Sequence, residues 1–365
     1  MDLRQHLSQP DISIEAHIAS RGAALAASLE GRLPLYLDTR FWIMVREVRD
    51  GTSVRLDERE IVRLIEALVA ERRIFCPIAE PTFLELMRQG NDAQRQATAH
   101  AIDTLSAGVA ILPHDERMVA EAERSLRGWL VDGARPALLP AWTSLAYVLG
   151  EIYPAATPFA PDIERGIQKA FFDHLWTRPI AEIAAALDPD TFTDVEEQRR
   201  IAATLSADNE RHRADMRSFD RVLDQEFRGV AAVIAARSVR LAALLGPEAA
   251  AKPAAAARVA VAGLRELLKR DQDARCLPTA HVHAVIHALL RWEHRDRAIT
   301  ANDLVDFRHA AAALGHCRAF LTEAKLCGLL HHRRLPLASL HSVRVLSDRA
   351  EIVVYLQGVA AGGAD

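Results

Sequence analysis

Residues 33–39 read Leu-Pro-Leu-Tyr-Leu-Asp-Thr, and this stretch decides the fold that the sequence predicts. The apolar run follows Gly31 and gives way to the polar pair Thr39 and Arg40, which is typical of a buried strand. Its last residue is followed directly by Asp38. Parallel α/β sheets bind their ligands outside the carboxyl ends of their strands, so an acid at this position marks a candidate binding edge.

Two more acids follow a similar pattern. Glu85 comes after a strand-like run at 73–78 and lies inside the next amphipathic helix. Near the other end of the chain, the apolar run 319–321 leads directly into Thr322 and Glu323. Because the carboxyl ends of parallel strands share one edge of a sheet, we expect these acids to gather there.

A fourth acid comes from the block 302–309, Asn-Asp-Leu-Val-Asp-Phe-Arg-His. Within it, Asp303, Asp306 and His309 are spaced by three residues, which places them on roughly one side of a helix. Two interpretations of Asp303 stay open. It lies near the helix entrance as a candidate ligand, and it also follows Thr300 at the spacing of a capping box, which predicts a structural role.

The order of these motifs resembles the PIN-domain family of metal-dependent ribonucleases. The matching pieces are Leu-Tyr-Leu-Asp-Thr at 35–39, Phe-Leu-Glu-Leu at 83–86, the block at 302–309 and Phe-Leu-Thr-Glu at 320–323. Weaker matches are the run 109–113 with the helix after it, and a strand at 342–346 with a helix after it. Together these pieces cover roughly residues 30–130 and 276–358.

The resemblance implies a site for Mg²⁺ or Mn²⁺ and RNA as the substrate. It gives the catalytic role to Asp38, Glu85, Asp306 and Glu323, adds Asp303 as a further metal ligand, and suggests support from Glu80, Thr39, His309 and Thr322. Hard cations prefer such oxygen ligands, and a bound ion activates water and offsets charge on a phosphodiester. Glu323 stands where the family more usually has an aspartate, so its longer side chain is suited to binding through water. Glu80 at a helix start equally suits the helix dipole.

The predicted fold class is α/β, with a PIN-like parallel sheet flanked by helices and interrupted by a large all-helical insertion. The predicted parts are an N-terminal helical arm (1–30), the first part of the PIN-like domain (31–127), the helical insertion (128–275), the second part of the domain (276–358) and a disordered tail (359–365). The insertion is rich in Ala, Leu, Glu and Arg and contains no convincing strand. Its main predicted feature is a long helix at 195–245.

Composition narrows the functional classes. The 365 residues are half hydrophobic, so the chain can bury a sizeable core in one or two domains. The net charge is −4, so contact with RNA requires a local basic patch such as 331–334 or 291–297. Four cysteines without paired short spacings predict neither a zinc ribbon nor a disulfide framework. We expect a cytoplasmic protein without a membrane partner, because the sequence has no signal-peptide core and no apolar run of spanning length.

Histidines offer a competing metal-site hypothesis. His283 and His287 are four residues apart on a predicted helix that begins near Pro278, with His281 and His294 close by. That spacing suits zinc, but Ala284 stands where a zinc protease of the His-Glu-x-x-His type has glutamate. Packed or solvated histidines are therefore the preferred interpretation.

The sequence thus predicts a metal-dependent endoribonuclease, with a toxin or defence component as one biological setting. The alternative is a non-catalytic PIN-like protein whose helical insertion binds a partner protein or a second copy of the chain. Phosphate-cradling glycine loops and the Gly-x-Ser-x-Gly nucleophile motif are missing from the sequence, which argues against NTP hydrolysis and serine-hydrolase chemistry.

Overall fold

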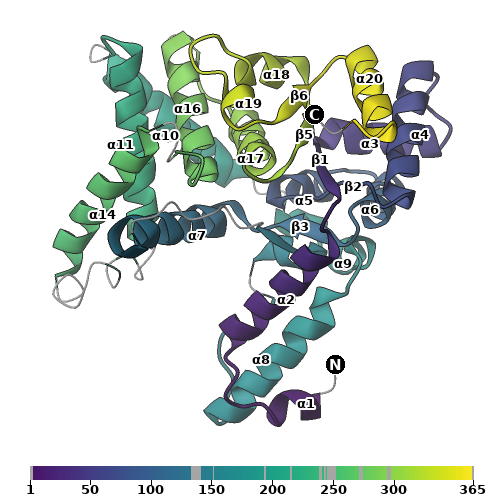
Figure 1. Ribbon diagram of the computed structural model, residues 1–365, viewed down its shortest axis with the longest axis horizontal. Helices are drawn as coiled ribbons and strands as arrows, with labels where there is room; N and C mark the ends of the chain where they lie inside the picture. Colours follow the sequence, from purple (N-terminus) through teal and green to yellow (C-terminus); the bar gives the residue numbers. More distant parts are fainter. Residues whose placement is uncertain are drawn as a thin grey trace. The chain divides into compact units, whose positions relative to one another are not determined.

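The computed structural model describes residues 3–132, 141–150, 152–192, 195–213, 216–237, 241, 244, 252–270, 274–293 and 297–363 (Figure 1). The fold is mixed α/β and mostly helical, with short strands. The chain divides into two compact units, each assembled from separate segments. Unit 1 comprises Met1–Pro113, Pro140–Thr193 and Ser347–Asp365, and unit 2 comprises His114–Leu139 and Asp194–Leu346.

Unit 1 contains the strand from which the prediction began. Strand β1 (Leu33–Leu37) has the predicted bounds and pairs in parallel with β2 (Ile74–Phe75). Leu35, Tyr36 and Leu37 are fully buried, as expected for a strand covered on both faces. The parallel α/β character predicted for this region is therefore confirmed.

A second strand pair in unit 1 corrects the sequence prediction. Strand β3 (Val109–Ile111) pairs antiparallel with β4 (Trp142–Ser144), which lies in the stretch predicted to be all helical. Two of its three residues, Thr143 and Ser144, are polar, so no apolar run marks this strand, and its pairing partner β3 lies about 30 residues earlier. Trp142 also packs edge-on against Phe75, with ring centroids 5.3 Å apart.

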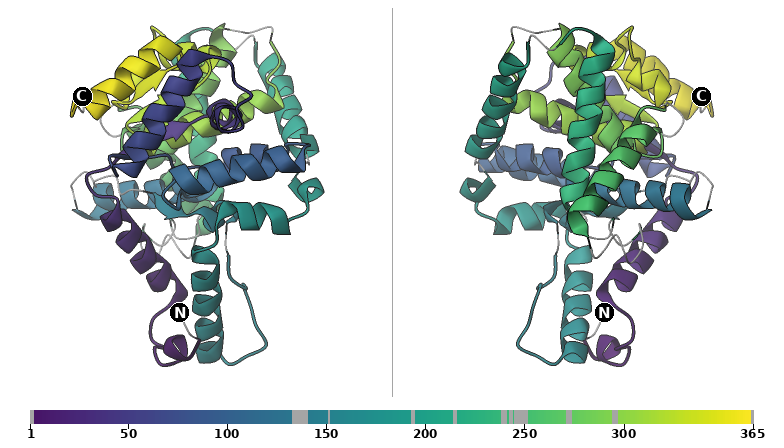
Figure 2. Two further views of the ribbon diagram at one scale, coloured as in Figure 1. Left: turned by 90° about the vertical axis from the view of Figure 1, so that its right-hand side faces the viewer. Right: turned by 90° about the vertical axis from the view of Figure 1, so that its left-hand side faces the viewer.

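Helices make up most of unit 1. They are α1 (Leu3–Leu7), α2 (Ile14–Ser28), α3 (Thr39–Arg49), α4 (Leu56–Ala70), α5 (Glu80–Met87), α6 (Asp92–Leu105), α8 (Pro161–Trp176), α9 (Ile180–Ala186) and α20 (Arg349–Ala360). Short 3-10 turns, Leu145–Leu149 and Pro189–Phe192, complete the list. Helices α1 and α2 lie beside α8, as two views of the ribbon show (Figures 1 and 2).

The predicted disordered tail at 359–365 begins too early. Helix α20 continues to Ala360, and the Arg73 guanidinium donates hydrogen bonds to the carbonyl oxygens of Val359 and Ala360. A cation that binds the last carbonyls stabilises the carboxyl end of a helix. Sequence periodicity did not reveal this partner, which lies nearly three hundred residues away. Residues 364–365 lie outside the described part of the chain.

Unit 2 is built around a second parallel strand pair. Strand β5 (Ala319–Leu321) pairs with β6 (Arg344–Leu346), with Phe320 opposite Val345. The apolar run at 319–321 predicted β5, and the resemblance implied a strand at 342–346; both strands are present, although β6 begins two residues later than expected. The helices are α7 (His114–Arg127), α10 (Val195–Arg211), α11 (Phe219–Arg237), α14 (Pro253–Leu268), α16 (Pro278–Glu293), α17 (Ala301–His316), α18 (Ala324–Leu330) and α19 (Leu337–Leu340), with a π turn at Gly128–Asp132.

The long helix predicted at 195–245 is wrong as a single element. Helix α10 ends at Arg211, and α11 begins at Phe219. The Ser218 hydroxyl accepts a hydrogen bond from the Arg221 amide at 3.3 Å, which is the signature of a new helix start. Helix α11 then packs against α14 and α16 and buries Val222, among other residues. The part of the prediction at 238–240, 242–243 and 245 lies outside the described residues.

The predicted insertion at 128–275 supplies elements to both units, since α8 and α9 belong to unit 1 and α10, α11 and α14 to unit 2.

Among the helices that the structure describes, none has the length and apolarity needed to cross a membrane.

Candidate functional site

Asp38 lies where the predicted site requires it, at the carboxyl end of β1. It is the N-cap residue of α3, and its Oδ1 atom accepts a hydrogen bond from the Arg40 amide at 3.4 Å. That distance is at the weak end for an N–H···O bond. The side chain is largely buried, with 9% of the residue exposed. The turn from a buried strand into a helix therefore holds a carboxylate in a restricted place.

Helix α5 brings Glu85 to the same strand end. The Tyr36 hydroxyl lies 3.3 Å from the Thr82 hydroxyl, and the Thr39 hydroxyl donates a short hydrogen bond to Glu85 Oε2. Both pairs have the same spacing, because Thr39 follows Tyr36 by three residues and Glu85 follows Thr82 by three. Positions three apart share one side of a helix, so α5 presents Thr82 and Glu85 together toward this segment.

The structure thus connects three of the predicted residues within unit 1. Asp38 and Thr39 are adjacent in the chain, and Thr39 binds Glu85 directly. Glu80 begins α5, where Pro81 occupies the first turn, and it suits the positive end of the helix dipole there. We refer to Asp38, Thr39 and Glu85 below as the acidic junction.

Unit 2 holds the other predicted acids. After β5, the buried Thr322 donates its amide to the Leu346 carbonyl at 3.0 Å, which extends the pairing with β6 by one residue. Glu323 follows as the N-cap residue of α18, where its side chain makes no capping hydrogen bond, and it is exposed. The predicted order of strand, acid and helix is present here, but Glu323 is exposed and makes no capping bond, whereas Asp38 is buried and caps α3.

Both carboxylate oxygens of Asp303 accept hydrogen bonds. Its Oδ1 accepts hydrogen bonds from Arg297 at 2.7 Å and from Lys325 at 3.0 Å. Its Oδ2 accepts from Arg297 and from both the amide and the hydroxyl of Thr300, which completes a capping box at the start of α17. Burial by itself would raise the pKa of Asp303, but the Thr300 hydrogen bonds, Lys325 and Arg297 hold it at about 2.

These contacts decide between the two roles that the sequence left open for Asp303. The capping box is formed, and two cations already neutralise the carboxylate. The proposed metal ligand of the sequence prediction therefore has a structural role in this fold. The sequence contained the capping box spacing but gave no sign of Arg297 or Lys325 as partners.

Asp306 lies on the wall of a cavity of about 260 Å³ within unit 2. The same cavity is lined by Asp303, Arg297, Lys325 and the apolar ring of Phe307, among other residues. Asp306 is partly exposed, whereas His309, one turn further along α17, is buried. The spacing of three residues placed Asp303 and Asp306 near each other, as predicted, and put His309 in the protein interior.

The central histidines are packed rather than arranged as a metal site. The rings of His283 and His287 stack with centroids 4.6 Å apart, and His287 also meets Phe307 edge-on. Burial lowers the pKa of His287 to about 4, so the ring is neutral at physiological pH. His281 faces His341 at 3.2 Å. His294 lies outside the described residues.

Sequence reasoning missed another cluster, in unit 1. His6, His17 and Asp173 are the one group of three His, Cys, Asp or Glu residues among the described residues whose ligand atoms lie close enough together to hold a metal ion. The first two residues precede β1, and the third is more than 150 positions away. No spacing in the sequence indicates this contact, because it depends on how α1 and α2 pack on α8.

Comparison with known proteins gives no family for this chain. It matches no protein-family model, no curated protein and no solved structure.

Proposed function

We propose that this chain is a metal-dependent endoribonuclease with a PIN-like arrangement, in which Asp38 and Glu85 bind Mg²⁺ or Mn²⁺. The observation that carries the proposal is the acidic junction. At the carboxyl end of a parallel strand, Asp38 is followed by Thr39, and the Thr39 hydroxyl binds Glu85 of helix α5. Partly buried oxygen ligands in such a position suit a hard divalent cation.

Asp348, another acid that follows a strand, is an ordinary helix N-cap and can be compared with Asp38. Asp348 follows β6 and accepts hydrogen bonds from the amides of Ala350 at 2.9 Å and Glu351 at 3.1 Å, and it is exposed. Asp38 is largely buried, and its capping bond is longer. The start of α3 therefore holds Asp38 less closely than the start of α20 holds Asp348, and Asp38 lies next to Thr39, which contacts Glu85. This placement supports a role for Asp38 beyond capping.

The residues have separate roles in the proposed reaction. Asp38 and Glu85 supply oxygen ligands, and the Thr39 hydroxyl orients the Glu85 carboxylate. A divalent ion, when bound, supplies an activated water and offsets charge on the phosphodiester. The sequence adds Asp306 and Glu323 of unit 2 to the ligand set, and their role stays a prediction, while Asp303 fixes the start of α17.

Cleavage of RNA tests the proposal most directly. A labelled single-stranded RNA is incubated with the protein in Mn²⁺, in Mg²⁺ or in a chelator. Asp38→Asn and Glu85→Gln keep the size of each side chain and remove its charge, so each is expected to lower the cleavage rate by about 100-fold. Asp348→Asn is the matched control, because it changes an acid at a strand end that has no role in the proposed site.

The outcomes separate the two predicted classes of protein. Metal-dependent cleavage that Asp38→Asn abolishes and Asp348→Asn preserves supports the nuclease. Cleavage that is equal in the wild type and in Asp38→Asn, or is missing from both, refutes it. In that case the non-catalytic interaction protein becomes the better description. The same series with Asp306→Asn and Glu323→Gln tests whether those acids belong to the ligand set.

A further inference from the structure

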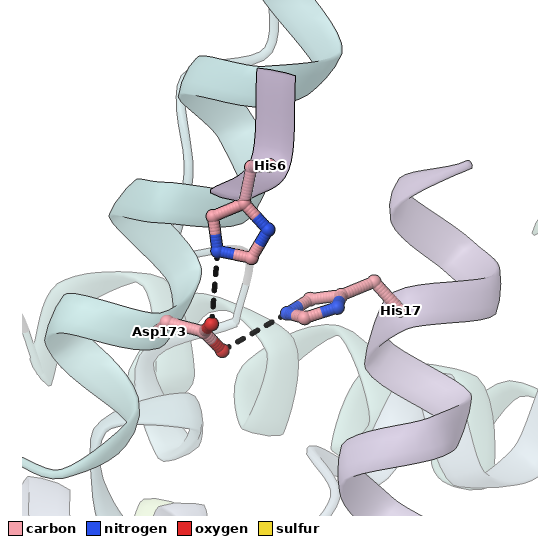
Figure 3. Close-up of side chains that lie close together, drawn as sticks. All are labelled: His6, His17 and Asp173. Atoms are coloured by element: carbon pink, nitrogen blue, oxygen red, sulfur yellow. Dashed lines mark hydrogen bonds and ion pairs between the residues drawn. The ribbon is translucent and has the colours of Figure 1, made fainter. Parts of the chain in front are cut away.

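The carboxylate of Asp173 on α8 lies between two histidine rings. His6 Nε2 is 3.0 Å from Asp173 Oδ2, and His17 Nε2 is 2.9 Å from Oδ1. Figure 3 shows the two rings approaching one carboxylate from α1 and α2. The rings themselves meet edge-on, with centroids 5.1 Å apart. His6 and Asp173 are buried, and His17 is largely so.

One face of α8 holds the N-terminal segment in the position that forms this cluster. Gly166, Lys169 and Asp173 are spaced by three and four residues, so they line one side of the helix. A Cβ atom at Gly166 would lie only 2.6 Å from a methyl carbon of Leu7, so glycine permits the close approach of α1. The Lys169 ammonium donates to the carbonyl oxygens of Gln9 at 2.7 Å and Ile12 at 3.1 Å.

The contact made by Lys169 holds the loop between the two N-terminal helices. Lys169 is buried, and burying an ammonium group is costly unless its hydrogen bonds compensate. Its two bonds fix the loop between α1 and α2, the elements that carry the histidines. The arrangement therefore sets the positions of His6 and His17 relative to Asp173 before any ligand binds, which is how proteins prepare metal sites.

The surroundings of the cluster are partly apolar. Phe172 packs edge-on against His17 at 5.8 Å and helps to form an apolar surround. Arg21 Nε lies 3.4 Å from Asp173 Oδ1, as an outer partner of the carboxylate.

We propose that His6 Nε2, His17 Nε2 and one oxygen of Asp173 form a binding site for a divalent transition metal, with Zn²⁺ as the best match. All their ligand atoms lie within 4.8 Å of one another. Ligands of a tetrahedral zinc ion lie roughly 3.3 Å apart, given zinc–ligand bonds of about 2.0 to 2.1 Å, so small side-chain adjustments suffice. Two imidazoles and one carboxylate are a common three-residue set that leaves a coordination position open.

A cavity beside Asp173 gives this site a route to solvent. It measures about 320 Å³ and is lined by Arg21, Asp173, Arg178 and Glu182, among other residues of unit 1. A cation can reach the carboxylate from this side. The arginines also suit an anion as an additional ligand of the open position, because guanidinium groups bind carboxylate and phosphate well. The site differs in chemistry from the acidic junction, whose ligands are oxygens only.

Metal binding to the full-length protein, stripped with a chelator, tests the proposal without RNA or cleavage. Zn²⁺ affinity is measured by competition with a chromogenic chelator, and Co²⁺ absorption reports imidazole coordination. The wild type is expected to bind one equivalent tightly. His17→Gln keeps a hydrogen-bond donor for Asp173 but loses the imidazole, so we expect affinity to fall by about 100-fold. His100→Ala, an exposed histidine of α6, is the matched control and is expected to bind as the wild type does.

The alternative is a purely structural role, in which Asp173 joins α1 and α2 to α8 through hydrogen bonds. With that role, His17→Gln would bind Zn²⁺ as well as the wild type, or the wild type would show no tight Zn²⁺ binding. Either result overturns the metal site. Thermal unfolding with and without Zn²⁺ provides a second measurement. Zn²⁺ is expected to raise the Tm of the wild type and of His100→Ala, but not of His17→Gln. An equal rise in all three proteins contradicts the proposal.

Discussion

The two units use their acids differently. In unit 2, Asp303 has Arg297, Lys325 and the start of α17 as partners, and its carboxylate is neutralised. In unit 1, the acidic junction places Asp38 next to Thr39 in the chain, and the Thr39 hydroxyl binds Glu85. The sequence predicted Asp38 as a ligand because it follows a buried strand, and Asp303 because it lies near the entrance of a helix. The comparison teaches that the partners of a carboxylate, rather than its position at an element boundary, separate a structural acid from a candidate ligand.

The largest expected effect concerns the structural acid. Asp303→Ala removes a buried cap and the partner of two cations, so we expect a loss of about 2 to 3 kcal/mol in the free energy of unfolding. Asp348→Ala removes an exposed cap at another strand end and should cost about 1 kcal/mol. Urea unfolding of both variants measures the difference. Equal losses would contradict the distinction between a buried, paired acid and an ordinary cap.

Acid titration gives the next largest effect. The pKa of Asp303 is lowered to about 2 in the folded protein, below its usual value in an unfolded chain. A lowered carboxyl pKa stabilises the fold at pH values above the unfolded pKa, and this stability is lost as the pH falls toward 2. The contribution is about 2 kcal/mol, and Asp303→Asn should remove this part of the pH dependence. The free energy of unfolding, measured between pH 5 and pH 2, tests this. If it falls as steeply in the variant as in the wild type, Asp303 is not the source of the pH dependence.

Thr39→Val probes the acidic junction itself. The substitution keeps the shape of the side chain and removes the hydroxyl that binds Glu85. We expect a stability loss of about 1 kcal/mol and, if the proposed function holds, a fall in cleavage of about 10-fold, because Glu85 loses its orientation. Thr104→Val is the control, since its hydroxyl bonds only to the His100 carbonyl on an exposed helix face. A similar loss of cleavage in both variants would count against the role of Thr39.

The local elements of this fold could be predicted, and the contacts between them could not. An uninterrupted apolar run with an acid after it gave β1 and β5 correctly, because a buried strand needs little more than local hydrophobicity. Strand β4 was not predicted, because it depends on pairing with β3. The two cations that contact Asp303 were not predicted either, since side-chain partners come from tertiary packing. The cluster of His6, His17 and Asp173 was the hardest feature to predict, because no sequence pattern connects the two N-terminal histidines with Asp173.

The smallest effect sharpens the comparison within unit 2. Lys325 is 63% exposed, whereas Arg297 is 36% exposed and binds both oxygens of Asp303. Ion pairs with an exposed partner contribute little, so Lys325→Ala should cost about 0.5 kcal/mol or less. Arg297→Ala removes two hydrogen bonds to a buried carboxylate and should cost about 1 kcal/mol. Urea unfolding at low and high salt distinguishes them, and a larger loss for Lys325→Ala would show that the lysine is the main partner of Asp303.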